Sequence, residues 1–177
     1  MRWLTVLLLP LLAACAQVPA NAPQTVAAVD LPRYVGQWHE VARFPNRVED
    51  GRGLNCVDVT ATYAQRPDGQ ISVVNRCRNA ADGGAERVAD GRAYVVEGSN
   101  GARLRVTFFW PFYGDYWVIA LDPDYRWVVV GDPRRDYLWV LSRTPRMDAA
   151  SYERAVAAAR AQGFDVTKLQ RTSQSGA

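Results

Sequence analysis

The sequence predicts an all-β protein: an eight-stranded antiparallel up-and-down β-barrel with a C-terminal α-helix packed outside it. Two observations support this fold. From residue 31 to about 143, short segments of alternating apolar and polar residues are separated by turns rich in Gly, Pro, Asn and Asp. The first segment contains Gly36 and Trp38. A tryptophan there can plug one end of a barrel, and the small glycine lets another segment pass close to the backbone.

Eight strands are expected in sequence, joined as hairpins, which is the number that closes a small up-and-down barrel. Tight turns at 67–69, 99–101 and 122–124 would share one end of it, and the longer loops would share the other. One end is therefore expected to be narrow and the other to form a mouth. The predicted strands are 35–44, 55–65, 70–78, 86–97, 102–110, 116–121, 125–131 and 137–143.

A helix is expected after the barrel, over Ala149–Gln162. Asp148 is a typical N-cap, and Gly163 supplies the stop. Residues 164–169 are a candidate for one last short strand, and residues 173–177 are expected to be a disordered tail.

The N-terminus has the features of a targeting segment. Met1-Arg2 is a short positive region, and Trp3 to Leu12 is apolar but too short to span a bilayer stably. Leu12-Ala13-Ala14-Cys15 resembles the bacterial lipoprotein signal, which is cut before a cysteine that becomes lipidated. This predicts a signal peptide over 1–14, an acylated Cys15, and a flexible tether over 15–30. The alternative is an ordinary secretory signal with a chance cysteine.

Composition limits the function classes. The 177 residues are 49% hydrophobic and 22% charged, as in an ordinary globular domain. The net charge of +3 is too small to indicate nucleic-acid binding. His39 is the only histidine, and no G-x-S-x-G motif occurs. We therefore expect no enzymatic activity, no metal and no cofactor, with a catalytic barrel kept as an alternative.

Three motifs in order resemble the lipocalin family, and specifically its bacterial outer-membrane lipoprotein subgroup. They are Gly36-Gln37-Trp38, Asp124-Tyr125, and Arg143 in Leu138-Trp139-Val140-Leu141-Ser142-Arg143. The resemblance covers roughly 31–172. It implies that Arg143 stacks on Trp38 and, with Gly36, closes the narrow end of the barrel.

The resemblance also implies a ligand: a fatty acid or lysophospholipid, stored or transported in the cell envelope. Strand alternation agrees, because it turns apolar side chains inward, although these side chains would equally fill a solid core. Trp110 and Tyr113 are expected at the rim, on a loop that gates the pocket, touches a membrane, forms a dimer contact, or packs on itself around Pro111. The predicted wall is Leu104, Val106, Phe108, Trp139 and Leu141.

The resemblance places the protein in the bacterial envelope, on the outer membrane through Cys15, with its domain facing the periplasm; Ala16 favours this membrane by the sorting rule of enteric bacteria. A homodimer is possible, and so is a structural envelope lipoprotein without a ligand. Because an exported domain meets oxidising conditions, Cys56 and Cys77 are predicted to form a disulfide between neighbouring strands. Strand alternation places them on opposite faces, so the pairing needs a bulge in one strand.

Overall fold

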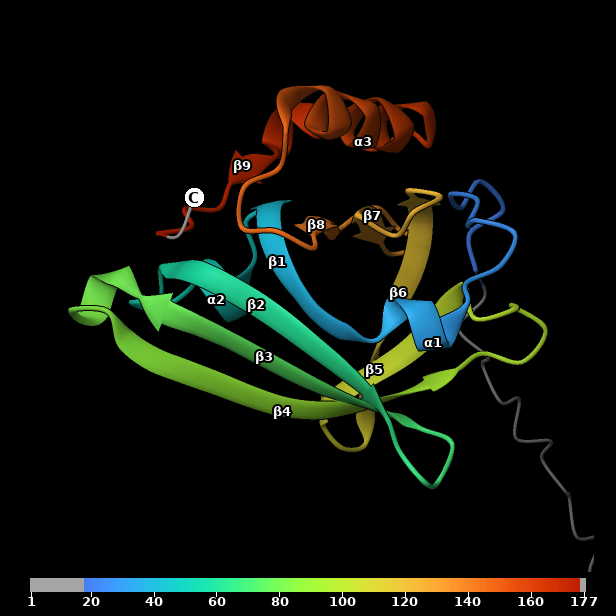
Figure 1. Cartoon of the computed structure of the whole chain (residues 1–177), viewed down its shortest axis with the longest axis horizontal. Coiled ribbons are helices and arrows are strands. Elements are labelled where there is room, and N and C mark those ends of the chain that lie inside the picture. The colour runs from blue at the N-terminus through green and yellow to red at the C-terminus, as the bar shows by residue number, and fades with distance from the viewer. Residues whose placement is uncertain (1–17, 176–177) are drawn as a thin grey trace, which may run out of the picture.

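The computed structural model describes residues 18–175 and shows a closed antiparallel barrel (Figure 1). Neighbouring strands follow the order β2-β3-β4-β5-β6-β7-β8-β1, and β1 pairs back with β2. A short ninth strand, β9, adds to β1. The predicted fold class is confirmed. The strands are β1 Gly36–Arg43, β2 Cys56–Gln65, β3 Ile71–Asn79, β4 Ala85–Val95, β5 Arg103–Phe109, β6 Phe112–Leu121, β7 Trp127–Gly131, β8 Leu138–Ser142 and β9 Gln170–Arg171.

The helices are α1 Leu31–Tyr34, α2 Arg47–Asp50 and α3 Ala149–Ala161, with 3₁₀ turns at Ala80–Asp82 and Val166–Lys168. α2 lies inside the predicted loop 45–53. It forms because the Asn46 side chain accepts hydrogen bonds from the first free N–H groups, those of Val48 and Glu49. None of the helices in the described part of the chain is long and apolar enough to cross a membrane.

β6 is longer than predicted. It begins at Phe112, so the expected loop 110–115 shrinks to a hairpin tip at Trp110-Pro111. The reason is pairing: Gly114 lies opposite Val106, and Asp115 lies opposite Arg105. An aromatic run with Pro and Gly reads as a loop, but these backbone groups complete a ladder.

The disulfide between Cys56 and Cys77 is present, as predicted. A bulge in β2 permits it. The register of β2 on β3 shifts between Val57 and Thr60, and Asp58 has a φ of +53°. The shift puts Cys56 on the same face as Cys77, where both are buried.

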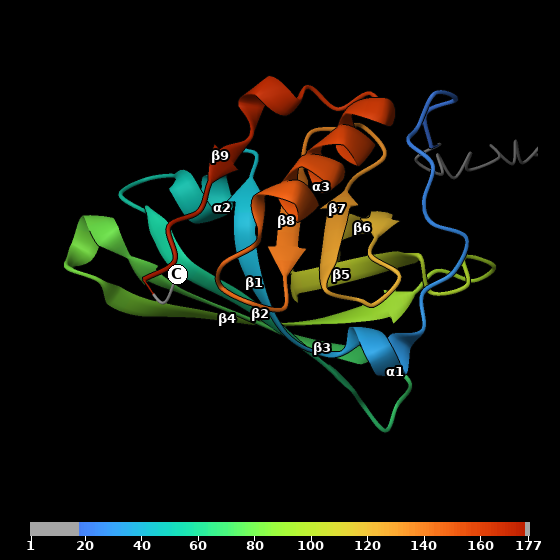
Figure 2. The ribbon, with the colours of Figure 1, turned by 45° about the horizontal axis from the view of Figure 1, so that its top comes forward.

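α3 packs outside the barrel over β6 and β7, as expected (Figure 2). The Asp148 side chain caps it by accepting from the backbone N–H of Ser151 at 2.8 Å. Its buried face contacts a second apolar layer on the outer side of the sheet. That layer includes Trp117, Ile119, Trp127, Val129, Val140 and Phe164.

The segment before α1 is not a flexible tether along its whole length. The backbone N–H of Val26 donates to the oxygen of Val118, and that of Val29 to Asn100, both at 2.9 Å. The Val29 side chain is buried in the barrel core. We call residues 21–30 the strap. Cys15 and the expected signal peptide 1–14 lie outside the described residues.

The C-terminal residues 173–175 are not a free tail either. β1 and β2 pair only at the end of the barrel that carries the tight turns, through Gly36–His39 of β1, and then separate. Thr172 donates its N–H to the oxygen of Val41. Gln174 donates from its side chain to the oxygens of Glu40 at 2.8 Å and Val59 at 2.9 Å. The C-terminus therefore fills the gap between the two strands. Residues 176–177 lie outside the described part.

Candidate ligand-binding site

The half of the barrel nearest the tight turns is solidly packed. Leu104 and Leu141, two of the predicted wall residues, lie in this half with exposed fractions of 1% and 5%. They contact a cluster that also contains Tyr34, Tyr63, Ile71, Val73, Val118 and Val130. The alternative in which the inward side chains fill a solid core therefore holds for this half, which we call the lower half.

Three tyrosine hydroxyls meet within this packed region. The hydroxyls of Tyr34 and Tyr116 are 2.6 Å apart, and Tyr116 donates to Tyr63 at 3.0 Å. Burial raises the pKa of Tyr63 to about 12 and the pKa values of Tyr34 and Tyr116 well above 10. All three hydroxyls stay protonated at neutral pH and form a buried polar cluster in the packed half of the barrel.

The upper half of the barrel is open. Val106, Phe108 and Trp139 adjoin the interior cluster but are only partly buried. Ala89, which pairs with the inward-facing Asn75, is exposed. Gly91 makes room for an aromatic ring: a Cβ there would lie 2.7 Å from Cδ1 of Phe108. Apolar side chains thus line a space that solvent reaches.

The two predicted rim residues do not both face this space. Gly114 lies opposite the inward Val106, so its neighbour Tyr113 faces outward. The Tyr113 ring packs against Tyr94 on the outer face, with centroids 5.4 Å apart. Trp110 is 73% exposed at the tip of the β5–β6 hairpin. Tyr113 is therefore corrected from a rim residue to a brace on the outer wall.

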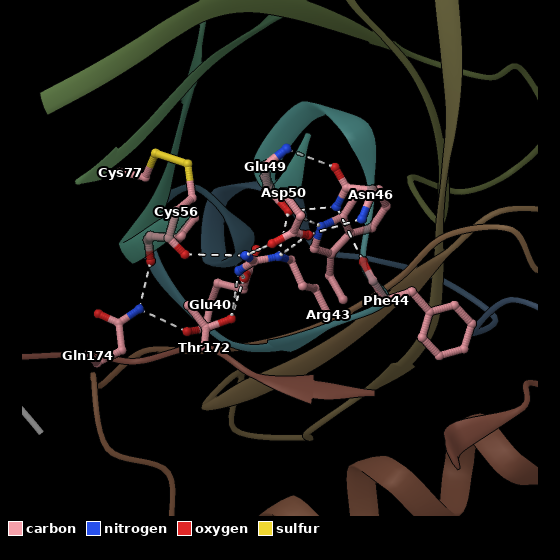
Figure 3. A network of polar contacts seen from close by, with 12 residues as sticks. Glu40, Arg43, Phe44, Asn46, Glu49, Asp50, Cys56, Cys77, Thr172 and Gln174 are labelled. Atoms are coloured by element: carbon pink, nitrogen blue, oxygen red, sulfur yellow. Dashed lines mark hydrogen bonds and ion pairs between the residues drawn. A yellow bond between two sulfur atoms is a disulfide. The ribbon is translucent and has the colours of Figure 1, made fainter. Parts of the chain in front are cut away.

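A buried ionic cluster flanks the mouth (Figure 3). At its centre is Arg43, 6% exposed, at the end of β1. Its guanidinium donates to Glu40 at 2.7 Å and to both carboxylate oxygens of Asp50 on α2, and lies 3.3 Å from Glu49. It also donates to the oxygen of Cys56 and the hydroxyl of Thr172, each at 3.2 Å. One side chain therefore joins β1, α2, β2 and the C-terminus.

The cluster perturbs its own acids in opposite directions. Burial, reinforced by the charge of Glu49, raises the pKa of Glu40 to about 8 despite the nearby Arg43. Burial acts to raise the pKa of Asp50 and is the largest single influence. The hydrogen bonds from Arg43 and from the backbone N–H of Asn46, together with the charge of Arg43, outweigh it and hold that pKa below its usual range. Glu49 contacts Trp139 of the predicted wall, since its carboxylate accepts from Trp139 Nε1 at 3.5 Å.

Sequence reasoning missed this cluster. One signal was available: Glu40 lies two residues after the inward Trp38, and an ionisable residue at an inward position of a barrel strand needs a partner. Its partners are Arg43, three residues along β1, and Thr172, and Arg43 in turn binds Asp50 on α2. No local pattern connects α2 and residue 172 to β1.

The opposite end is sealed as the motifs imply. The Arg143 guanidinium carbon lies 3.8 Å from the Trp38 ring centroid. Its nitrogens donate to the backbone oxygens of Gln37, Arg33, Tyr34 and Tyr125 at 2.7–3.3 Å. Gly36, with a φ of +98°, would bring a Cβ to 3.4 Å from Arg143. The contact predicted between Arg143 and Trp38 is thus present.

Together these features define a calyx, a barrel sealed at one end and open at the other over an apolar wall. Comparison with known proteins agrees. The lipocalin-like domain family matches residues 29–174, so the chain belongs to the lipocalin family. Among the described residues, no group of three or more His, Cys, Asp and Glu side chains is placed to hold a metal ion.

The relatives define the branch of the family. The chain is 44% identical over 167 residues to the outer membrane lipoprotein Blc of Escherichia coli K12, covering 94% of this chain and 92% of that protein. It is 39% identical to temperature-induced lipocalin-1 of Arabidopsis thaliana, covering 86% and 83%. The structure of insecticyanin from the tobacco hornworm Manduca sexta superimposes with a TM-score of 0.67, at 18% identity and 85% and 83% coverage, which shows the shared fold.

Proposed function

We propose that this protein is a lipid-anchored envelope protein whose calyx binds one acyl chain of a fatty acid or lysophospholipid. The observation that carries the proposal is the open upper half of the barrel, lined by Val106, Phe108 and Trp139. These side chains are apolar and partly exposed in the free protein, so an acyl chain that covers them gains hydrophobic free energy.

The packed lower half limits how deep the chain reaches. Leu104 and Leu141 are already covered by their neighbours and, with the tyrosine cluster, form the floor of the remaining space. We infer that the tail stops at this floor and contacts Val106, Phe108 and Trp139, with its head at the mouth. Leu104 and Leu141 then shape the floor and do not touch the ligand.

The anchor and location rest on the N-terminal motif and on the relatives. Leu12-Ala13-Ala14-Cys15 resembles the lipoprotein signal, and relatives 40–44% identical are named outer membrane lipoproteins. We propose that Cys15 is acylated, that the protein is held on the outer membrane, and that its domain faces the periplasm. A Cys15→Ser variant should then leave the membrane fraction or remain uncut. A variant that is processed and sediments like wild type would contradict the anchor.

The binding test is titration of the delipidated Cys15→Ser chain with fatty acids and lysophospholipids, followed by tryptophan emission. We expect saturable binding, micromolar or tighter, from the apolar area of a long chain less the cost of association. Trp139→Ala should weaken it, and Leu104→Val, at the packed floor, is the matched control that should not. Absence of binding to every acyl ligand would favour a structural lipoprotein, and turnover of a ligand would favour the catalytic alternative.

A further inference from the structure

Exposed hydrophobic side chains gather at the mouth end of the barrel. None of the closed-end turns that the structure describes carries an exposed large hydrophobic side chain, and neither does α1. Val18 precedes the strap, and Tyr94 braces the outer wall. The other six large hydrophobic residues with high exposure belong to the mouth half: Val48 on α2, Val88 on β4, Phe109, Trp110 and Phe112 on the β5–β6 hairpin, and Tyr137 before β8.

The hairpin tip is the strongest part of this pattern. Phe109, Trp110 and Phe112 have exposed fractions of 79%, 73% and 77%. Their exposure contradicts the alternative in which the aromatic residues pack on themselves around Pro111. The stem below them is braced, since Arg105 pairs with Asp115 at 3.2 Å and donates to the oxygen of Tyr113 at 3.1 Å. The strands thus hold three apolar side chains out in water.

The strap brings the N-terminus to the same end. The last residue of the strap lies beside the closed-end turns, where the N–H of Asp30 donates to the hydroxyl of Tyr125. Followed back toward the N-terminus, the strap runs to the C-terminal end of α3 (Figure 2). There Arg135, in the mouth-side loop between β7 and β8, donates to the oxygen of Asn21 at 2.7 Å. Cys15 is six residues earlier, so an extended chain keeps it within about 20 Å of this loop.

We propose that the protein sits mouth-first on the bilayer, with Phe109, Trp110 and Phe112 inserted among the lipid headgroups and upper acyl chains. This orientation rests on the acylation of Cys15 in the proposed function. Only six residues separate Cys15 from Asn21, which is held at the β7–β8 loop, so an anchor at Cys15 keeps the membrane near the mouth. Tryptophan is well suited to this depth, because its ring is apolar and its N–H is polar.

A second copy of this chain fits the tip less well. Three aromatic side chains at this exposure offer roughly 500 Å². A stable protein interface needs about 800 Å² from each partner. The bilayer has no such requirement, because the lipid anchor already holds the protein in place and the hairpin only sets its orientation. In this orientation the calyx opens toward the lipid from which its ligand comes.

The test uses the acylated full chain in vesicles of phosphatidylethanolamine and phosphatidylglycerol with brominated acyl chains, which quench nearby tryptophans. We expect clear quenching in the wild type and loss of more than half of it in Trp110→Phe, which removes the probe but stays apolar. A Phe109→Ser/Phe112→Ser variant should reduce quenching of Trp110 at least twofold. As a matched control, Glu97→Trp places a probe on the exposed closed-end turn, and its added emission should not be quenched.

Equal quenching of the wild type and Trp110→Phe would overturn the mouth-first orientation. So would quenching of the Glu97→Trp probe, or shelter of Trp110 in a dimer without quenching. The fatty-acid titration of the Cys15→Ser chain keeps the two proposals apart, because Phe109 and Phe112 are outside the calyx wall proposed to hold the ligand. Normal binding without quenching contradicts the orientation alone, and quenching without binding contradicts the ligand alone.

Discussion

Replacing Arg143 with alanine should destabilise the barrel from its closed end. The guanidinium covers the Trp38 ring and donates to four backbone oxygens. A half-buried cation–π contact contributes about 1 kcal/mol. The lost hydrogen bonds add about 2–3 kcal/mol in total, since water replaces part of each. We therefore expect a loss of about 3–4 kcal/mol, which for a domain of this size lowers the melting temperature by about 6–16 °C.

Urea unfolding with the disulfide intact, followed by tryptophan emission, measures this loss. Arg143→Lys should fall between wild type and Arg143→Ala, because it keeps the charge but not the planar fork of donors. Arg66→Ala is the matched control: it removes an exposed closed-end ion pair with Asp68 and should change stability by less than about 0.5 kcal/mol. Ligand affinity should stay near wild type, since the floor separates Arg143 from the open half. A stability of Arg143→Ala within 0.5 kcal/mol of wild type would refute the reasoning.

Three further perturbations test other parts of the molecule. The pKa of Glu40 rises from 4.5 to about 8 on folding, so the folded chain binds a proton that the unfolded chain has released. Its contribution to stability is complete below about pH 4.5 and is lost as pH rises toward 8, and Glu40→Gln should flatten that slope in urea unfolding at pH 5, 6.5 and 8. Cys56→Ser or Cys77→Ser should cost about 3 kcal/mol in the same assay by releasing a loop of 21 residues; an equal stability after reduction of the wild type would argue against this. Gly91→Ala should lower stability by about 1–3 kcal/mol and weaken fatty-acid binding by displacing the Phe108 ring, and normal values in both measurements would contradict that packing.

The barrel and its closed end were predictable because their signals are local. Alternation along each strand identified the strands, and the motifs around Trp38 and Arg143 placed the seal. The bulge needed for Cys56 and Cys77 also followed from alternation, because the two cysteines otherwise face opposite ways.

The strap and the ionic cluster were not predictable in this way. The strap has no periodicity, and what holds it is backbone hydrogen bonding to distant turns, such as that of Val29 to Asn100. Arg43 has partners 7 and 129 residues away in sequence, on a four-residue helix and at the C-terminus. Contacts of that kind depend on the closed barrel and leave little trace in the pattern of any one segment.

The seam between β1 and β2 also constrains when the protein finishes folding. Thr172 and Gln174 fill this gap and complete the hydrogen bonds of Glu40 and Val59. These residues follow all eight barrel strands and α3 in the chain. Eight strands alone leave a slit in the wall, with the Glu40 carboxylate facing it. Closure of the wall therefore waits until the segment after α3 docks against β1 and β2, and a chain truncated before Gln170 is expected to keep an open wall and to be more sensitive to protease.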